Sequence, residues 1–101
     1  MSEPDSITLR LAPALVEVGH AVPVYSLPLA QAPTLGQAVV ALGKAYPALE
    51  ALLWHGGVRG ERLNPQLVLF YNDEQVPAGT LLHSVLAAGD VLELITAIEG
   101  G

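Results

Sequence analysis

The chain has 101 residues, a length that fits one domain with a single modest core and leaves no room for a second. Its formal net charge is −6 and it contains no cysteine, which excludes nucleic-acid binding through a basic surface, disulfides, thiolate metal sites and a cysteine nucleophile. Every apolar run is shorter than the roughly 18 residues of a membrane span, and the N-terminus MSEPDS is acidic, unlike a secretory signal, so we expect a cytoplasmic protein without a membrane partner.

The N-terminal third predicts two paired strands. Residues 7–12, ITLRLA, alternate apolar and polar side chains, as a half-buried strand does. Residues 21–29, AVPVYSLPL, are rich in β-branched and aromatic residues but contain two prolines, which cannot donate hydrogen bonds to a neighbouring strand. We therefore expect the second segment to be an edge strand that pairs with the first in a hairpin, with its turn near Gly19 and His20.

An amphipathic helix is predicted in the middle of the chain. Thr34 and Gln37 have the spacing of a capping box, and Pro47 ends the helix. The apolar side chains that recur along one stripe of this helix are Leu35, Val39, Leu42 and Tyr46. Residues 48–54, ALEALLW, add a further helical turn, and the glycines and proline of residues 55–65 indicate a loop.

The C-terminal third adds the remaining strands. Residues 66–71, QLVLFY, form a strand that a tight turn at NDE connects to a short return strand beginning at QV. Residues 81–89 are expected to form a short helical or turn segment, and residues 91–97, VLELITA, form the last strand.

The predicted order is β-β-α-β-β-β, with a single helix between the strands. A helix of this length covers only one face of a sheet. The predicted fold is therefore α+β, with a mixed sheet of four to five strands and one main helix across one face. Residues 1–101 form one domain in this prediction, with a frayed N-terminus at residues 1–5 and a flexible tail at residues 97–101.

Side chains that could carry catalysis or hold a metal do not form a recognisable motif. His20, His55 and His83 are far apart in the sequence and lack carboxylates at ligand spacing, and no serine lies in a GxSxG context. The adjacent Asp73 and Glu74 are expected to be turn residues. We therefore expect no metal site and no autonomous hydrolase activity.

The last four residues, IEGG, are the feature that a fold alone does not explain. Glycine has no Cβ, so an extended pair of glycines fits a slot too narrow for side chains. Gly101 then presents its α-carboxylate, and Ile98, Glu99 and Gly100 provide access to it. An ionised carboxylate is a poor electrophile at neutral pH, so acyl chemistry at Gly101 requires activation, most economically by adenylation.

Three segments resemble the ubiquitin-like sulfur carriers of the MoaD/ThiS family: the C-terminal GDVLELITAIEGG, the strand ending FYNDEQV, and the helix TLGQAVVALGKAYP. The resemblance covers about residues 5–101 and implies a β-grasp, ubiquitin-like fold. It also implies that a ubiquitin-activating-type adenylyltransferase uses ATP to adenylate Gly101, and that a sulfurtransferase or other sulfur donor converts the adenylate to a thiocarboxylate. The carrier itself is then a protein co-substrate without a bound cofactor, not an enzyme.

The resemblance leaves the receiving enzyme open between the large subunit of molybdopterin synthase and a cysteine synthase. The segment TAIE lacks the proline commonly seen in the small subunit of molybdopterin synthase, and the YNDEQV hairpin looks more like the carrier used in cysteine biosynthesis. Two further functions also stay open. One is a ubiquitin-like modifier that joins Gly101 to lysines of other proteins, and the other is a non-catalytic β-grasp interaction module.

A partner-binding patch is predicted because the strands QLVLFY and VLELITA are apolar on both faces. Since one helix covers one face only, the other face leaves apolar side chains exposed, and such patches mark interaction sites. We expect Val68, Phe70 and Ile95 to form this patch and Leu69 to face the helix. The alternative is that residues 48–65 fold over the patch.

Overall fold

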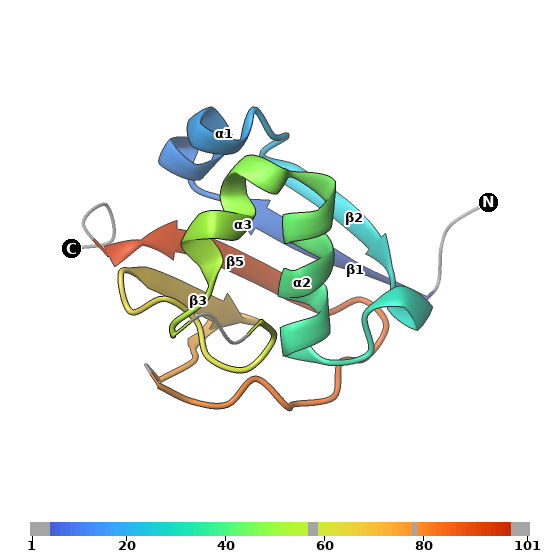
Figure 1. Cartoon of the computed structure of the whole chain (residues 1–101). Helices are drawn as coiled ribbons and strands as arrows, with labels where there is room; N and C mark the ends of the chain where they lie inside the picture. The colour runs from blue at the N-terminus through green and yellow to red at the C-terminus, as the bar shows by residue number, and fades with distance from the viewer. Residues whose placement is uncertain (1–4, 57–58, 78, 98–101) are drawn as a thin grey trace.

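The computed structural model describes residues 5–56, 59–77 and 79–97, and Figure 1 shows how they are arranged. The strands are β1 (Ser6–Leu11), β2 (Val24–Pro28), β3 (Leu67–Tyr71), β4 (Glu74–Gln75) and β5 (Val91–Thr96). The α-helices are α1 (Pro13–Gly19), α2 (Leu35–Ala45) and α3 (Pro47–Leu53), and one short 3-10 helix, η1, is Leu29–Gln31. The predicted frayed N-terminus lies outside the described residues except for Asp5.

The strands form one mixed sheet in the order β2-β1-β5-β3-β4. β1 and β5 are parallel neighbours at its centre, and the other neighbouring pairs are antiparallel. β2 lies at one edge, as its prolines predict. The arrangement confirms the predicted α+β class and the mixed sheet of a β-grasp fold.

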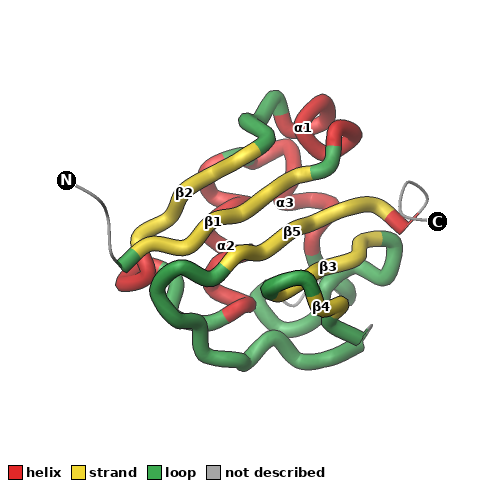
Figure 2. The backbone as a smooth tube through the Cα atoms, turned by 180° about the vertical axis from the view of Figure 1, so that it is seen from behind, coloured by secondary structure: helices red, strands yellow, loops and turns green. Residues whose placement is uncertain are grey.

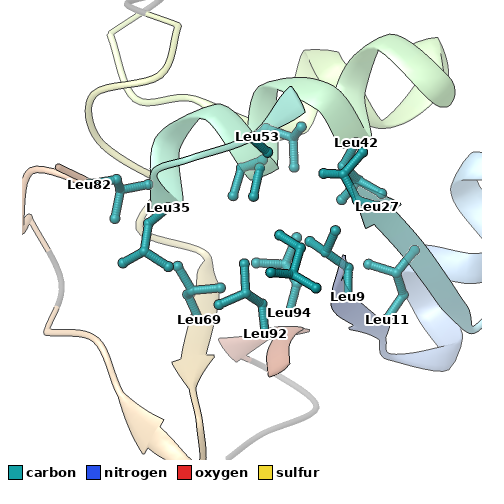
Figure 3. Packing of buried hydrophobic residues seen from close by; sticks show 14 of the residues in the cluster. Leu9, Leu11, Leu27, Leu35, Leu42, Leu53, Leu69, Leu82, Leu92 and Leu94 are labelled. Atoms are coloured by element: carbon teal, nitrogen blue, oxygen red, sulfur yellow. The ribbon is translucent and has the colours of Figure 1, made fainter. Parts of the chain in front are cut away.

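The molecule has two layers, because α2 and α3 pack across one face of the sheet and α1 lies beside α3 at one end (Figure 1). Seen from the other side, the strands lie in front of both helices (Figure 2). The core fills the space between the layers (Figure 3). Its most deeply buried large side chains are Ile7, Leu9, Leu15, Leu27, Val39, Leu42, Leu49, Leu53, Leu69, Leu92 and Leu94.

The central helix begins and ends as the sequence predicts. The Thr34 hydroxyl accepts a hydrogen bond from the backbone N–H of Gln37 (3.2 Å), which satisfies one of the free donors at the start of α2. Three of the four residues of the predicted apolar stripe are buried, and Tyr46 is half-buried. Pro47 starts α3, where its fixed φ suits the first helical position.

The prediction of a single helix, and of a simple hairpin turn near Gly19 and His20, was wrong. Residues 13–19 form α1, which begins at a proline and ends where His20 adopts a left-handed conformation with φ 49°. Gly19 lets α1 approach α3 closely, because a Cβ at this position would lie 2.6 Å from Cγ of Leu49. β1 and β2 are still antiparallel neighbours, but a helix connects them instead of a tight turn.

The segment at 81–89 contains no helix, contrary to one of the two predicted possibilities. Its Val85 forms an isolated bridge with Thr34, and Leu35 donates its backbone N–H to the carbonyl of Ser84 (3.0 Å). The segment therefore runs extended past the start of α2 and turns only at Gly89, whose φ is +88°. A positive φ of this size favours glycine.

Candidate partner-binding face and chain end

The face of the sheet opposite the helices carries the residues that the sequence placed outside the core. In β3, Leu67 and Leu69 point into the core, and the alternating residues Val68 and Phe70 lie on the other face. The described part of residues 48–65 does not fold over this face, because α3 packs against α2 on the helix side and Gly60 lies next to Gly36 of α2. Figure 2 shows this open face from the front.

Strand register brings the three predicted patch residues together. Val68 lies opposite Ile95 on the neighbouring strands, and Phe70 follows two residues after Val68 on the same face. We call Val68, Phe70 and Ile95 the open-face patch. All three side chains are half-buried, so each presents part of its apolar surface to solvent. The structure describes this geometry, and partner binding at the patch stays a prediction.

Charged residues border the open-face patch. Glu93 lies directly opposite Phe70, and Arg10 on the other side of β5 is the neighbour of Glu93. The row of neighbouring residues across the face therefore reads Val24, Arg10, Glu93 and Phe70 from edge to patch. An apolar centre with a charged border is the usual anatomy of a protein–protein interface.

The last described residues, β5 and Ala97, are held at the centre of the sheet. β5 lies between β1 and β3, and just after it the backbone N–H of Ala97 donates to the carbonyl of Gln66 (2.8 Å). The predicted functional residues Ile98, Glu99, Gly100 and Gly101 lie outside the described residues. Ala97 is the last described residue before them, and the hydrogen bond to Gln66 holds it at the end of β5.

An apolar hollow lies beside the end of β5. Its volume is about 160 Å³, and α1, α3, β3 and the end of β5 all contribute to it. The lining residues are Ala14, Leu15, Val18, Leu52, Asn64, Gln66, Leu67 and Thr96. The sequence prediction missed this hollow because it required α1, and the only signal for α1 was a proline at a helix-start position followed by small and apolar residues.

A hydrogen-bond cluster fixes the far end of β5, where the strand begins. The Asp90 carboxylate accepts from the Tyr71 hydroxyl (2.9 Å), the Asn72 side-chain amide (3.1 Å) and the backbone N–H of Ala87 (2.8 Å). Asn72 also accepts from the backbone N–H of Val91 (2.8 Å). These bonds tie the β3–β4 turn to the start of β5, and so set the register that assembles the open-face patch.

The cluster shifts the pKa values of both titratable members. Burial alone would raise the pKa of Asp90, but the hydrogen bonds from Ala87, Asn72 and Tyr71 favour the charged carboxylate and lower its pKa overall. The hydrogen bond to Asp90, then burial, then the negative charge of Asp90 raise the pKa of Tyr71. The sequence predicted a short helical or turn segment over residues 81–89, but it did not reveal this cluster.

The described residues contain no group of three His, Cys, Asp or Glu side chains that could hold a metal ion. His20 ends α1, and His55 and His83 are exposed at separate places. In the same part of the chain, no helix has the length and apolar character to cross a membrane.

Comparison with known proteins extends this description. A model of the ThiS family matches residues 22–101. The crystal structure of SAMP1 from Haloferax volcanii is 30% identical with a TM-score of 0.71, and the match covers 95% of this chain and 99% of that one. Comparison with curated proteins gave no match.

Two further structures support the fold at lower identity. Urm1 from Trypanosoma brucei is 24% identical, with a TM-score of 0.73 and complete coverage of both chains. A chain of the BexX/CysO complex from Amycolatopsis orientalis is 18% identical, with a TM-score of 0.73 and coverage of 94% of this chain and 99% of that one. At these identities the likeness establishes a β-grasp, ubiquitin-like fold.

Proposed function

The chain belongs to the ThiS family, among the ubiquitin-like sulfur carriers and modifiers, and from this premise we propose that it carries sulfur on Gly101. A carboxylate oxygen of Gly101 attacks the α-phosphate of ATP in an activating enzyme, and pyrophosphate leaves. Sulfide delivered by a donor then attacks the acyl carbon, AMP leaves, and a thiocarboxylate remains. The protein takes part as a co-substrate, and the adenylyltransferase supplies the catalysis.

The observation that carries this proposal is the family match, which extends through the glycine pair to Gly101. Two features of the chain support it. The sequence has no cysteine, so the protein has no thiol of its own on which to hold sulfur. The glycine pair also follows the central strand β5 in the sequence. An activating enzyme could therefore bind the folded domain while its active site accepts two residues without side chains.

We further propose that the open-face patch is where the activating and receiving enzymes dock. Apolar side chains exposed on a rigid sheet provide contact area at low conformational cost. The CysO chain of known structure was crystallised in a complex with BexX, which gives a precedent for a stable partner of this fold. A receiving enzyme of cysteine or molybdopterin biosynthesis would bind here after the activating enzyme has left.

The first test is activation of the chain end. Deleting Gly101 should abolish ATP–pyrophosphate exchange by the cognate adenylyltransferase, while the thermal transition stays nearly unchanged because Ala97 and β5 are untouched. Replacing Gly100 with Val should also block exchange, since a β-branched side chain would not enter a slot shaped for glycine. A matched control is Ala30→Val, an exposed position in η1, which should exchange normally.

The second test is sulfur transfer. After incubation with ATP, the adenylyltransferase and a sulfur donor, the intact mass should rise by the exchange of one oxygen for one sulfur, and alkylation should map to Gly101. Sulfur found elsewhere, or full exchange activity after Gly101 is deleted, would reject the proposal. Adding candidate receiving enzymes to the loaded carrier then distinguishes cysteine from molybdopterin biosynthesis by the product formed.

A second candidate function is protein modification. It is favoured by the 30% identity to SAMP1, a protein described as a small archaeal modifier. In that case the same activated Gly101 forms isopeptide bonds with lysines of other proteins. A protease that cleaves after glutamate would cut after Glu99 and leave a Gly-Gly remnant on the target lysine. Peptides with this remnant, seen with the intact chain and lost when Gly101 is deleted, would identify this function.

A further inference from the structure

The edge strand β2 has backbone groups that no neighbouring strand uses. The Leu11 N–H donates to the Pro23 carbonyl (2.9 Å), and the Leu29 N–H donates to the Asp5 carbonyl (2.7 Å). Because hydrogen-bonding direction alternates along an antiparallel strand, the odd-numbered residues of β2 direct their backbone groups to β1. Val24 and Ser26 therefore direct their N–H and C=O groups away from the sheet, and no strand among the described residues lies beyond them.

The exposed edge is also apolar, and it is short. Val22 is 46% exposed and Val24 is 56% exposed, so both present apolar surface beside the unused backbone groups. Pro23 and Pro28 lie at either end, and neither can donate a hydrogen bond. These prolines limit pairing to a few residues and discourage the long edge-to-edge contacts through which sheets aggregate.

On the helix side of the sheet, β2 contributes to an aromatic pair, and a hollow with one lysine in its lining lies between η1 and α2. The ring of Tyr25 on β2 packs edge-to-face against Tyr46, with 5.7 Å between ring centroids. Between η1, which follows β2 directly, and α2 lies a hollow of about 410 Å³ lined by Gln31, Gln37, Val40, Ala41 and Lys44. On the opposite side of the strand, Arg10 is the neighbour of Val24. Lys44 lies two residues before Tyr46, whose ring packs on Tyr25 of β2, and Arg10 pairs with Val24, so the ends of α2 and β1 nearest this edge each contribute a cation in a chain with net charge −6.

We propose that β2 is a second docking site, at which a partner protein adds an extended peptide segment as a new strand. The backbone of that segment pairs with Val24 and Ser26, its central residues are apolar, and acidic residues flank them to meet Lys44 and Arg10. This site differs from the open-face patch and the chain end, so a partner could bind it while sulfur chemistry proceeds at Gly101.

A second copy of the chain fits this edge less well. The β2 sequence VYSLP contains no acidic residue. Pairing β2 with β2 around a twofold axis would place Lys44 and Arg10 of one copy near the same residues of the other, and like charges repel. The charge pattern therefore favours an acidic peptide over self-association.

The test uses the full chain and a synthetic peptide, acetyl-Glu-Val-Ile-Val-Glu-amide, followed by NMR. Binding should move the Val24 and Ser26 amide protons downfield and slow their exchange with solvent. Ser26→Pro removes a donor that β1 does not use, so the protein should fold and bind at least about tenfold more weakly, whereas Ser26→Ala should bind normally. A peptide with Lys in place of Glu should bind at least about tenfold more weakly to the unaltered protein.

A charge-reversal variant tests the proposal even if Ser26→Pro does not fold. Lys44→Glu should lose affinity for the acidic peptide and gain affinity for its Lys counterpart. Shifts confined to the open-face patch, equal binding of both peptides, or no binding at millimolar peptide would overturn the proposal. Amide shifts at β2 that depend on protein concentration alone would instead identify a second copy as the occupant.

Discussion

The two faces of the sheet use the same kinds of residue for opposite purposes. On the covered face, Leu69 and Leu92 are at most 2% exposed and pack beneath α2 and α3. On the open face, the adjacent Phe70 and Ile95 are half-buried, although both are as apolar as the leucines beside them. An apolar side chain in this sheet therefore has no fixed role, and only its position relative to the helices decides whether it stabilises the fold or is available to a partner.

The largest expected effect comes from a charge on the covered face. Leu69→Asp would place an unpaired carboxylate among leucines, at a cost of more than about 4 kcal/mol, which is comparable to the whole stability of a small domain. The variant should lose its cooperative thermal transition and its near-UV circular dichroism. A folded Leu69→Asp protein would show that the assignment of the two faces is reversed.

The next largest effect concerns the close approach of helix α2 to the backbone at Gly60 and Leu82. A Cβ at Gly36 would overlap the carbonyl oxygen of Gly60 and lie 3.0 Å from that of Leu82, so Gly36→Ala should destabilise the protein by about 2–3 kcal/mol. Gly43 on the same helix is the matched control. A Cβ there would meet only side chains, at 3.2 Å or more, so Gly43→Ala should change the free energy of unfolding by less than about 1 kcal/mol.

Urea unfolding of the two glycine variants measures this difference. Equal destabilisation by both would mean that helix α2 does not depend on close contact with the loop at Gly60. The open face has no comparable constraint, because no helix approaches it in the described part of the chain.

Features set by local sequence and features set by long-range contacts differ in how well the sequence predicts them. Alternation in residues 7–12, the short apolar run in residues 66–71 and the capping box at Thr34 were sufficient to place β1, β3 and α2, since these signals are local. The seven residues of α1 are too few to show a helical period, so the hollow beside the end of β5 was not foreseen. The backbone groups of Val24 that face away from the sheet follow from strand register, which the sequence does not specify.

The Asp90 cluster was missed for the same reason, since it depends on contacts between residues far apart in the chain. Tyr71 and Asp90 are 19 residues apart and meet only when β3 and β5 pair in the observed register. Removing the three hydrogen bonds of its carboxylate by Asp90→Ala should lower the free energy of unfolding by about 2 kcal/mol, and Tyr71→Phe, which removes one of them, by about 1 kcal/mol.

The pH dependence of this loss tests its origin. The folded state lowers the pKa of Asp90 below its ordinary value of 3.8, so the stabilisation is fully present above that value and is lost as pH falls through the folded pKa. The difference between the unaltered protein and Asp90→Ala should therefore be constant near neutral pH and shrink in acid. A difference that does not change with pH would show that the ionised carboxylate is not its source.

The smallest expected effect on stability is on the open face, where it accompanies a large effect on binding. Phe70→Asp removes a half-buried ring and places a carboxylate opposite Glu93, so we expect a loss of about 1 kcal/mol in the free energy of unfolding and at least tenfold weaker binding to the activating enzyme. Phe70→Lys separates the loss of the ring from the repulsion between two carboxylates. Lysine also lacks the ring, but opposite Glu93 it does not introduce a like charge. Both variants should bind weakly by calorimetry, and the lysine variant should be the more stable. Normal binding by both would move the docking surface away from the open-face patch, and unfolding by both would show that Phe70 belongs to the core.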